Sequence, residues 1–289
     1  MRVSELLSGS RPSFSFEFFP PKTEEGLVKL FSTMEHLAEL EPSFVSVTYG
    51  AGGKTRGQTV EITRRIKKET GLEPVAHLTC RGHTRAEVAE TLAALDAAKV
   101  QNVLALRGDP PQSGEEPSGP KDFTYADELV TYIQETRDMC VGAACHPEGH
   151  LENPDKDDDL ERLAHKVSKG VDYLITQLFF DNSHYFNFVR RARGRGVSVP
   201  IIPGIMPVTN VAQLKRFTQM CGASVPLPLM SKLEKYAHDD QAVMAIGIEW
   251  AIKQCRELLA LGAPGIHFYT LNRSLATRVV CVGLRAFGA

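Results

Sequence analysis

The chain has 289 residues, 43% of them hydrophobic and 24% charged, with a formal net charge of -2. So small a charge argues against nucleic-acid binding, which usually requires a basic patch, and no apolar run reaches membrane-spanning length, so we expect no membrane segment. Residues 1–10 lack the apolar stretch of a signal peptide, and the six cysteines are scattered without a CxxC pair. We therefore expect a cytoplasmic protein with reduced, packed thiols.

The first expected strand contains an unusual carboxylate. Residues 13–22 read SFSFEFFPPK. Phe14, Phe16 and Phe18 alternate with polar residues, a period of two that predicts a strand, and two prolines end it because proline has no N–H to donate. A carboxylate among phenylalanines lies near low-dielectric surface, so we expect Glu17 to have a raised pKa and to carry a proton. The alternative is a carboxylate that ends the strand and pairs with an arginine.

Short apolar strands then alternate with amphipathic helices to the end of the chain. Further strands are predicted at residues 44–47, 75–79, 102–106, 141–145, 173–178, 199–202 and 266–270. Some helix ends are recognisable: Gly71 closes the helix predicted at 58–69, and Thr84 with Glu87 forms a capping box. A proline-containing stretch at 225–230 interrupts the alternation before a long helix and the last strand.

Eight strand–helix units predict the fold. Alternating β and α elements imply a parallel sheet with right-handed crossovers. Eight units predict a closed (β/α)8 TIM barrel of the α/β class, here with an extra helical insertion before the last strand. We expect residues 1–289 to form this barrel as a single domain. The alternative is an open doubly wound sheet, although Gly50, Gly52 and Gly53 do not have the spacing of the GxGxxG dinucleotide fingerprint.

Unusual polar residues fall repeatedly where the predicted strands end, which is where barrels of this class carry their sites. They are Glu17, Thr48, Tyr49, His77, Thr79, Arg107, Asp109, His146, His150, Gln177, Tyr269, Asn272 and Arg273. An acid, several hydrogen-bond donors and two arginines on one rim predict a site for a large, planar, partly anionic ligand.

Two motifs resemble metal sites but lack the necessary ligands. The motif from His146 to His150, HPEGH, is not HExxH, and its proline and glycine argue against one helix face that carries both histidines. The run DKDDD at residues 155–159 imitates the start of a calcium loop, but Leu160 stands where the turn glycine should be. We therefore predict no metal, and we expect this run to lead into a helix with Asp159 near its cap.

Seven motifs, in their order and spacing, resemble those of the methylenetetrahydrofolate reductase family. They are FSFEFFPPK, FVSVTYGAGG, HLTC, NVLALRGDPP, ITQLFFD, PGIMPV and HFYTLNR. The resemblance covers residues 13–284 and is to the bacterial form that has the catalytic domain alone. It implies an FAD-containing (β/α)8 barrel in which NAD(P)H reduces the flavin. Hydride then passes to 5,10-methylenetetrahydrofolate and gives 5-methyltetrahydrofolate for methionine synthesis.

The resemblance also implies roles for individual residues. Glu17 matches the general acid that protonates N10 of folate, and Asp109 matches a carboxylate near the flavin that favours the folate cation. The residues that would contact FAD are Thr48, Tyr49, Ala51, His77, Arg107, Gly108, Asp109, Tyr125, Ala126, His146, His150, Asp159 and Lys166. Those that would contact folate are Gln177, Phe217, Tyr269 and Arg273. Arg273 would face the glutamate carboxylate of folate, and Phe217 would be either an aromatic lid or a core residue of its helix.

Two positions depart from the family pattern. His146 stands where bacterial relatives have tyrosine before proline, and Arg162 stands where a smaller polar residue contacts the cofactor. One rival function is a barrel enzyme with another cofactor, such as an aldolase or a cobalamin-linked methyltransferase domain. The other is a non-catalytic subunit, which should have lost Glu17 or Asp109. The resemblance does not distinguish NADH from NADPH, and we expect a homo-oligomer.

Overall fold

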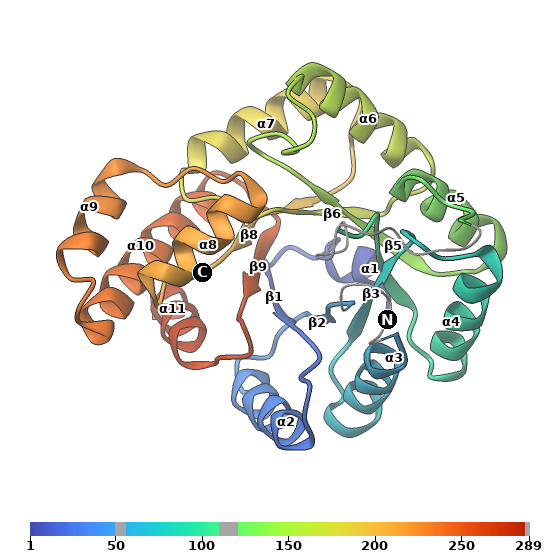
Figure 1. Ribbon diagram of the computed structural model, residues 1–289, viewed down its shortest axis with the longest axis horizontal. Coiled ribbons are helices and arrows are strands. Elements are labelled where there is room, and N and C mark those ends of the chain that lie inside the picture. The colour runs from blue at the N-terminus through green and yellow to red at the C-terminus, as the bar shows by residue number, and fades with distance from the viewer. Residues whose placement is uncertain (50–55, 110–120, 287–289) are drawn as a thin grey trace.

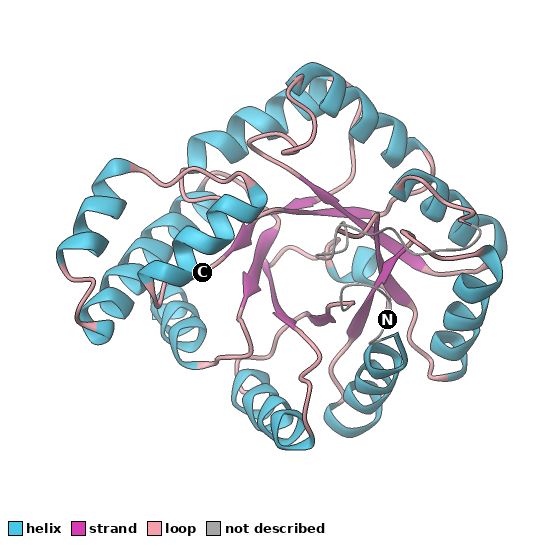
Figure 2. Ribbon diagram, viewed as in Figure 1, coloured by secondary structure: helices cyan, strands magenta, loops and turns pink. Residues whose placement is uncertain are grey.

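In the computed structural model, parallel strands form a ring that an outer layer of helices surrounds (Figure 1, Figure 2). The structure describes residues 1–49, 56–109 and 121–286. Within them the strands are β1 (Ser13–Phe18), β2 (Phe44–Val47), β3 (Pro74–Thr79), β4 (Asn102–Leu106), β5 (Cys140–Cys145), β6 (Tyr173–Thr176), β7 (Ile201–Ile202), β8 (Gly204–Ile205) and β9 (Gly265–Tyr269). Their order in the sheet is β7-β6-β5-β4-β3-β2-β1-β9-β8, so neighbours in sequence are neighbours in space.

The ring closes through one interrupted strand. β7 pairs with β6, and β8 pairs with β9, with Pro203 between the two segments. The strand predicted at 199–202 therefore continues past this proline, which donates no hydrogen bond. The Pro203 carbonyl accepts a hydrogen bond from the His267 N–H at 2.9 Å, and the Gly204 N–H donates to the Thr176 hydroxyl at 2.9 Å. The predicted α/β barrel is confirmed, and the open doubly wound sheet is excluded.

The helices lie outside the ring of strands (Figure 2). They are α2 (Glu24–Ala38), α3 (Arg56–Arg65) with its π-helical continuation η2 (Ile66–Thr70), α4 (Arg85–Ala97), α5 (Ala126–Thr136), α6 (Lys156–Ser168), α7 (Asn182–Gly194), α8 (Val211–Cys221), α9 (Leu227–Lys235), α10 (Asp240–Ala260) and α11 (Leu275–Ala286). α8, α9 and α10 all lie between β8 and β9, with α9 at the outer edge (Figure 1). Among the helices that the structure describes, none combines the length and the apolar character that a membrane crossing requires.

The helix ends agree largely with the sequence. Gly71 follows η2 with φ of 70°, and Thr84 and Glu87 form the predicted capping box at the start of α4. At α6 the cap is Asp155, whose carboxylate accepts hydrogen bonds from two N–H groups of the first turn. Asp159 lies about one turn inside the helix instead, so its carboxylate is available for another contact.

Side chains of β1 point alternately toward the helix layer and toward the barrel interior. Phe16 and Phe18 are fully buried in a hydrophobic cluster that also contains residues of α2. Ser15 and Glu17 face the interior, where both contact His267 of β9. The period of two therefore places Glu17 on the face opposite to the phenylalanines.

A short N-terminal helix, α1 (Val3–Leu6), closes the amino end of the barrel. Val3 is fully buried among interior side chains that include Phe44 and Tyr173, and its N–H donates to the Asn102 side-chain oxygen at 2.8 Å. A helix of four residues is too short to show a helical period, so the sequence does not predict it. Because the amino end is filled, a ligand site is expected at the carboxyl ends of the strands.

Candidate active site

Interior side chains from three strands meet around Glu17. Its Oε2 lies 3.4 Å from Nε2 of His77 in β3 and 3.5 Å from Nε2 of His267 in β9. On the other side of the His267 ring, Nδ1 lies 2.8 Å from the Ser15 hydroxyl. If Ser15 donates to Nδ1, His267 carries its proton on Nε2 and directs it at Glu17. The barrel thus brings a carboxylate and two imidazoles together.

These interior surroundings lower the pKa of Glu17. Burial acts to raise the pKa of this carboxyl, but the hydrogen bond from His267 and the electrostatic attraction of both imidazoles outweigh it, so the pKa lies below its ordinary value. The expectation of a raised pKa is wrong, although burial does act in that direction, because the two imidazoles that outweigh burial come from strands distant in sequence. Burial also lowers the pKa of His77 to about 4, so this imidazole is neutral at pH 7.

Two buried polar atoms beside Glu17 are candidates for ligand contact. Ser46 is the β2 residue that pairs with Glu17 in the strand register. Ser46 Oγ and His77 Nε2 are buried beside the Glu17 carboxylate, His77 Nε2 at 3.4 Å from its Oε2, but within the described residues neither makes a well-aligned hydrogen bond. A buried polar atom without a hydrogen bond costs free energy of folding. A polar ligand at this position would offer a hydrogen-bond partner to both atoms.

The turn after β9 is tied to the end of β1. Asn272 has φ of 56°, a left-handed conformation that is uncommon for residues other than glycine. Its side-chain oxygen accepts a hydrogen bond from the Phe19 N–H at 3.0 Å, and its NH2 group donates to the Phe19 carbonyl at 2.8 Å. The Thr270 hydroxyl donates to the Glu17 carbonyl at 2.6 Å. These bonds hold the exposed Arg273 beside the strand that carries Glu17.

The residues after β4 lie at the same end of the barrel. The Arg107 guanidinium forms a bidentate pair with Glu152, with both nitrogen–oxygen distances at 2.8 Å. Gly108 has φ of 92°, and a Cβ at this position would lie 3.1 Å from the Thr79 side chain, so both conformation and space favour glycine. Asp109 is exposed. The rim therefore presents the Arg107 guanidinium, paired with Glu152, and the exposed Asp109 carboxylate two positions further along the chain.

The segment from β5 to α6 carries further predicted contacts. The rings of His146 and His150 meet edge to face with centroids 4.7 Å apart, and burial, aided by nearby positive groups, lowers the pKa of His146 to about 3. The Asp159 carboxylate accepts a hydrogen bond from the His150 N–H at 3.2 Å, and burial raises the pKa of Asp159. Lys166 donates to the Ala144 carbonyl at 2.8 Å, and burial lowers its pKa. The structure thus brings four predicted FAD contacts together in one segment.

The remaining predicted FAD contacts are spread along the rim. Thr48 follows β2 and is half-buried, whereas the Tyr49 ring belongs to the hydrophobic cluster of the helix layer. Tyr125 is exposed and precedes the first residue of α5, Ala126. Ala51 lies outside the residues that the structure describes. Of this group, Tyr49 is the one whose side chain is already packed in the protein core.

The residues predicted to contact folate lie near β6, β9 and α8. Gln177 follows β6 and lines a small cavity together with His146. The Tyr269 hydroxyl donates to the Thr176 carbonyl at 2.6 Å, so its hydrogen is already used inside the barrel. Phe217 packs, partly buried, in the hydrophobic cluster that joins α8 to α9 and α10. This packing agrees with the alternative that Phe217 is a core residue of its helix.

Three residues at the site, Ser15, Ser46 and His267, were not predicted from the sequence. The pattern that could have identified them is the alternation of side chains between the two faces of a strand. Ser15 and Glu17 are two positions apart and share one face of β1, and His267 shares a face of β9 with Tyr269. Alternation within each strand would therefore have identified Ser15 and His267 once the strand ends were known.

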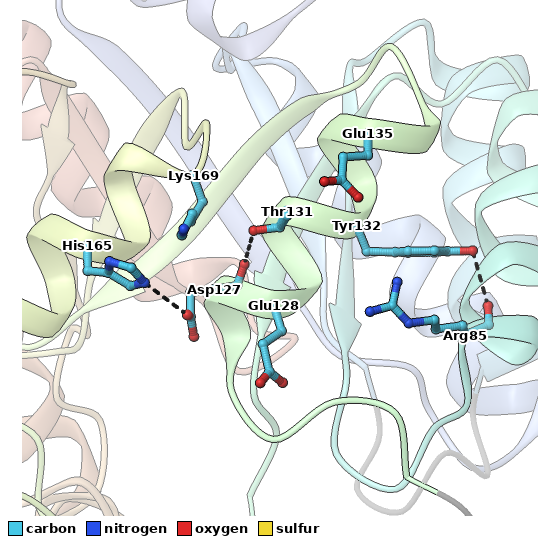
Figure 3. A pocket seen from close by; sticks show the side chains of 8 residues that line it. All are labelled: Arg85, Asp127, Glu128, Thr131, Tyr132, Glu135, His165 and Lys169. Carbon is cyan, nitrogen blue, oxygen red and sulfur yellow. Dashed lines mark hydrogen bonds and ion pairs between the residues drawn. The ribbon is translucent and has the colours of Figure 1, made fainter.

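A larger cavity, of about 220 Å³, lies along the outer surface of α5, between side chains of α4 and α6 (Figure 3). Charged side chains line it, among them Arg85, Asp127, His165 and Lys169, and His165 pairs with Asp127 at 3.6 Å. None of the predicted site residues lines this cavity, so the barrel mouth remains the candidate active site. In the described part of the chain, no group of three or more His, Cys, Asp or Glu side chains could hold a metal ion.

Comparison with known proteins identifies the family. The family model described as methylenetetrahydrofolate reductase matches residues 2–285. The chain is 38% identical over 268 residues to the 5,10-methylenetetrahydrofolate reductase of Escherichia coli, with 92% of this chain and 88% of that protein covered. It is 36% identical over 283 residues to methylenetetrahydrofolate reductase (NADH) 1 of Arabidopsis thaliana, with 94% of this chain but 48% of that protein covered. The chain thus spans about half the length of this plant relative and most of the bacterial one.

Solved structures agree with the fold. An uncharacterized protein from Clostridium thermocellum that binds two copies of 5-methyl-5,6,7,8-tetrahydrofolic acid superposes with a TM-score of 0.62 at 17% identity, with 99% of this chain and 98% of that chain covered. At such low identity the likeness supports the barrel fold alone. The family model, by contrast, spans nearly the whole chain, and the bacterial relative exceeds 30% identity over most of both lengths. The chain therefore belongs to the methylenetetrahydrofolate reductase family.

Proposed function

We propose that the protein reduces 5,10-methylenetetrahydrofolate to 5-methyltetrahydrofolate with NAD(P)H as electron donor, in one-carbon metabolism and methionine biosynthesis. Family membership supports the reaction class. The observation that carries the proposal is Glu17, a carboxylate held beside two imidazoles at the open end of the barrel. The reaction needs an acid there because N10 of folate takes up a proton as the methylene bridge opens. We also propose that residues 1–289 form one catalytic barrel domain.

FAD is the proposed cofactor, and the residues at the barrel mouth fit it. A dinucleotide needs cations for its diphosphate, and the candidates are Arg107, which would exchange its pairing with Glu152 for the phosphate, and Lys166 of α6, which donates to the Ala144 carbonyl. It also needs polar partners for its ring system, which the buried Ser46 Oγ and His77 Nε2 offer. When bound, FAD takes up hydride from NAD(P)H and delivers it to the one-carbon unit of folate.

Glu17 is the proposed general acid. Its lowered pKa leaves the carboxylate ionised at neutral pH in the ligand-free barrel, so it must first take up a proton. Solvent at the open end of the barrel supplies this proton, and His267, whose Nε2 lies 3.5 Å from the carboxylate and whose Nδ1 is held by Ser15, orients the carboxyl group. The proton then moves from Glu17 to N10 of folate. Asp109, on the rim, favours the folate cation that forms as the bridge opens.

Of the remaining residues proposed to contact folate, two make polar contacts and two form the walls of the site. The exposed Arg273 guanidinium is suited to a carboxylate of the folate glutamate tail. Gln177 lines the cavity at the end of β6 and is the proposed polar partner of the pterin. Phe217, whose ring is only partly buried in the cluster of α8, α9 and α10, is proposed to cover the bound folate with its exposed part. Tyr269, whose hydroxyl is bonded to Thr176, forms part of the wall of the site.

An anaerobic titration of the purified protein tests this proposal. We expect a yellow protein that releases FAD on heating, bleaches with NADH or NADPH, and regains its colour when methylenetetrahydrofolate is added. A colourless protein that takes up no FAD contradicts the proposal and favours another barrel enzyme. The faster-bleaching nucleotide identifies the donor. A homo-oligomer in the cytoplasm stays a prediction, which light scattering and cell fractionation check.

A further inference from the structure

The loop after β5 is joined to the end of α8 by one carboxylate. Glu148 accepts hydrogen bonds from the Ser224 N–H, at 3.1 Å to each carboxylate oxygen, and from the Ser224 hydroxyl at 2.6 Å. Nε2 of His184, in the first turn of α7, lies 3.5 Å from the Glu148 carboxylate and 3.2 Å from the Ser224 hydroxyl. The Glu148 side chain is 15% exposed. Three segments that are distant in sequence therefore meet at this carboxylate.

A second contact joins the same two segments. Gly222 ends α8 with φ of 74°, and a Cβ at Gly222 would lie 3.0 Å from Cδ1 of Leu151. The end of α8 thus rests on the loop that Glu148 belongs to. The small cavity between them is lined by His146, which we assign to FAD, and by Gln177, which we assign to folate. The junction therefore lies where the two proposed ligands would adjoin.

On the basis of the function proposed above, we propose that Glu148 is a positioning residue for the folate step. Ser224 lies just beyond α8, and Phe217 lies about one helical turn before the end of that helix. By holding Ser224, Glu148 fixes α8, and with it Phe217, against the loop that carries His146. Glu148 acts through α8 and donates no proton to the substrate. Its loss should weaken folate binding and spare the flavin chemistry.

The test is Glu148→Ala in the FAD-loaded protein, with the folate half-reaction followed by stopped flow over a range of methylenetetrahydrofolate concentrations. Removal of hydrogen bonds to a charged, partly buried acceptor should raise the apparent folate Kd about tenfold or more. The limiting rate of that half-reaction should change by less than about threefold, because the acid and the cofactor are untouched. FAD content and the rate of bleaching at saturating NAD(P)H should stay near those of the wild type.

Two further variants separate positioning from general damage. Glu234→Ala is the matched control, since it removes an exposed carboxylate that pairs with Lys215 of α8 at 2.7 Å, and it should leave the folate Kd unchanged. Ser224→Ala should raise the folate Kd in the same direction as Glu148→Ala. Because both substitutions remove the same contact, the double variant should bind folate no more weakly than Glu148→Ala alone.

The outcomes are distinct. A wild-type folate Kd in Glu148→Ala, or a loss of FAD as large as the loss of folate affinity, overturns the inference. If Glu148→Ala does not fold, Ser224→Ala decides instead: a raised folate Kd with normal FAD content supports the inference, and a normal folate Kd overturns it. Failure of the wild-type protein itself to regain colour with folate would contradict the proposed function rather than the role of Glu148.

Discussion

Glu17 and His267 are 250 positions apart in the sequence, yet their side chains lie 3.5 Å apart inside the barrel. β1 and β9 pair in parallel, with Ser15 opposite His267 and Glu17 opposite Tyr269. The contact therefore exists because the first and last strands of the chain are neighbours in the ring. Since Ser15 holds the far nitrogen of His267, the orientation of the imidazole toward Glu17 is fixed.

Replacement of Glu17 should separate the two half-reactions. Glu17→Gln keeps the size of the side chain but cannot donate a proton as a carboxylic acid, and general acid catalysis typically contributes about 10²–10⁴-fold. We expect oxidation of the reduced flavin by methylenetetrahydrofolate to slow by at least about 10²-fold. Bleaching of the flavin by NAD(P)H, which involves no N10, should survive. Stopped-flow mixing without oxygen measures each half, and a wild-type folate rate in the variant would assign the acid to another group.

Arg273 and Arg278 provide a matched pair of arginines for the folate tail. Arg273 lies in the turn beside Glu17, whereas Arg278 lies in α11 and pairs with Glu39 at 2.7 Å. A charged hydrogen bond to a carboxylate is typically worth about 1.5–3 kcal/mol, so Arg273→Ala should raise the folate KM about tenfold or more. Arg278→Ala should leave that KM unchanged. An equal effect of both substitutions on KM would show that Arg273 contributes no specific contact.

Asn272 is predicted to position both Arg273 and the end of β1. Asn272→Ala removes the two hydrogen bonds to Phe19 and places an alanine at positive φ, which together should cost about 1–3 kcal/mol of stability. Asn272→Gly removes the same bonds but tolerates the left-handed backbone, so it should cost less. Urea unfolding measures both, and the folate KM should rise in both. If glycine destabilises as much as alanine, the backbone conformation contributes little.

Much of the barrel could be predicted because its signals are local. Strand alternation in β1, the capping box at Thr84 and the glycine after η2 each depend on residues a few positions apart. The break in the strand at Pro203 and the short helix α1 were harder to predict from the sequence. The proline divides one strand into β7 and β8, and four residues of α1 gain their helical form from packing inside the barrel rather than from a pattern in the sequence.

The chemistry of the site was less predictable because it depends on residues far apart in the chain. The sequence around Glu17 contains four phenylalanines, and these indicated an apolar environment and a raised pKa. The neighbours that determine the pKa are His77 and His267, which only the closed ring brings to Glu17. The same holds for Glu148, whose partner Ser224 is 76 positions away. Resemblance of the motifs indicated which residues lie on the rim of the barrel, but it did not indicate which side chains contact one another there.

Burial of His77 should make the protein sensitive to mild acid. Burial lowers the pKa of His77 to about 4 from its ordinary value of 6.5. Between these values the unfolded chain binds a proton that the folded protein does not, so stability is full above about pH 6.5 and falls as the pH drops toward 4. The slope for one proton is about 1.4 kcal/mol per pH unit. His146, with a pKa lowered to about 3, acts in the same direction.

The test is urea unfolding of the FAD-free protein at several pH values from 7 to 5, because bound FAD would change the surroundings of both histidines. Glutamine cannot titrate, so His77→Gln should remove about 1.4 kcal/mol per pH unit from the slope of unfolding free energy against pH below about 6.5. The slope is the relevant quantity, because the substitution also changes absolute stability through packing. His146→Gln should reduce the slope by a similar amount, and the double variant should combine both reductions because each histidine contributes its own proton. An unchanged slope in His77→Gln would mean that this imidazole takes up its proton equally in the folded and unfolded chain, and His77 would then be charged beside Glu17 below about pH 6.5.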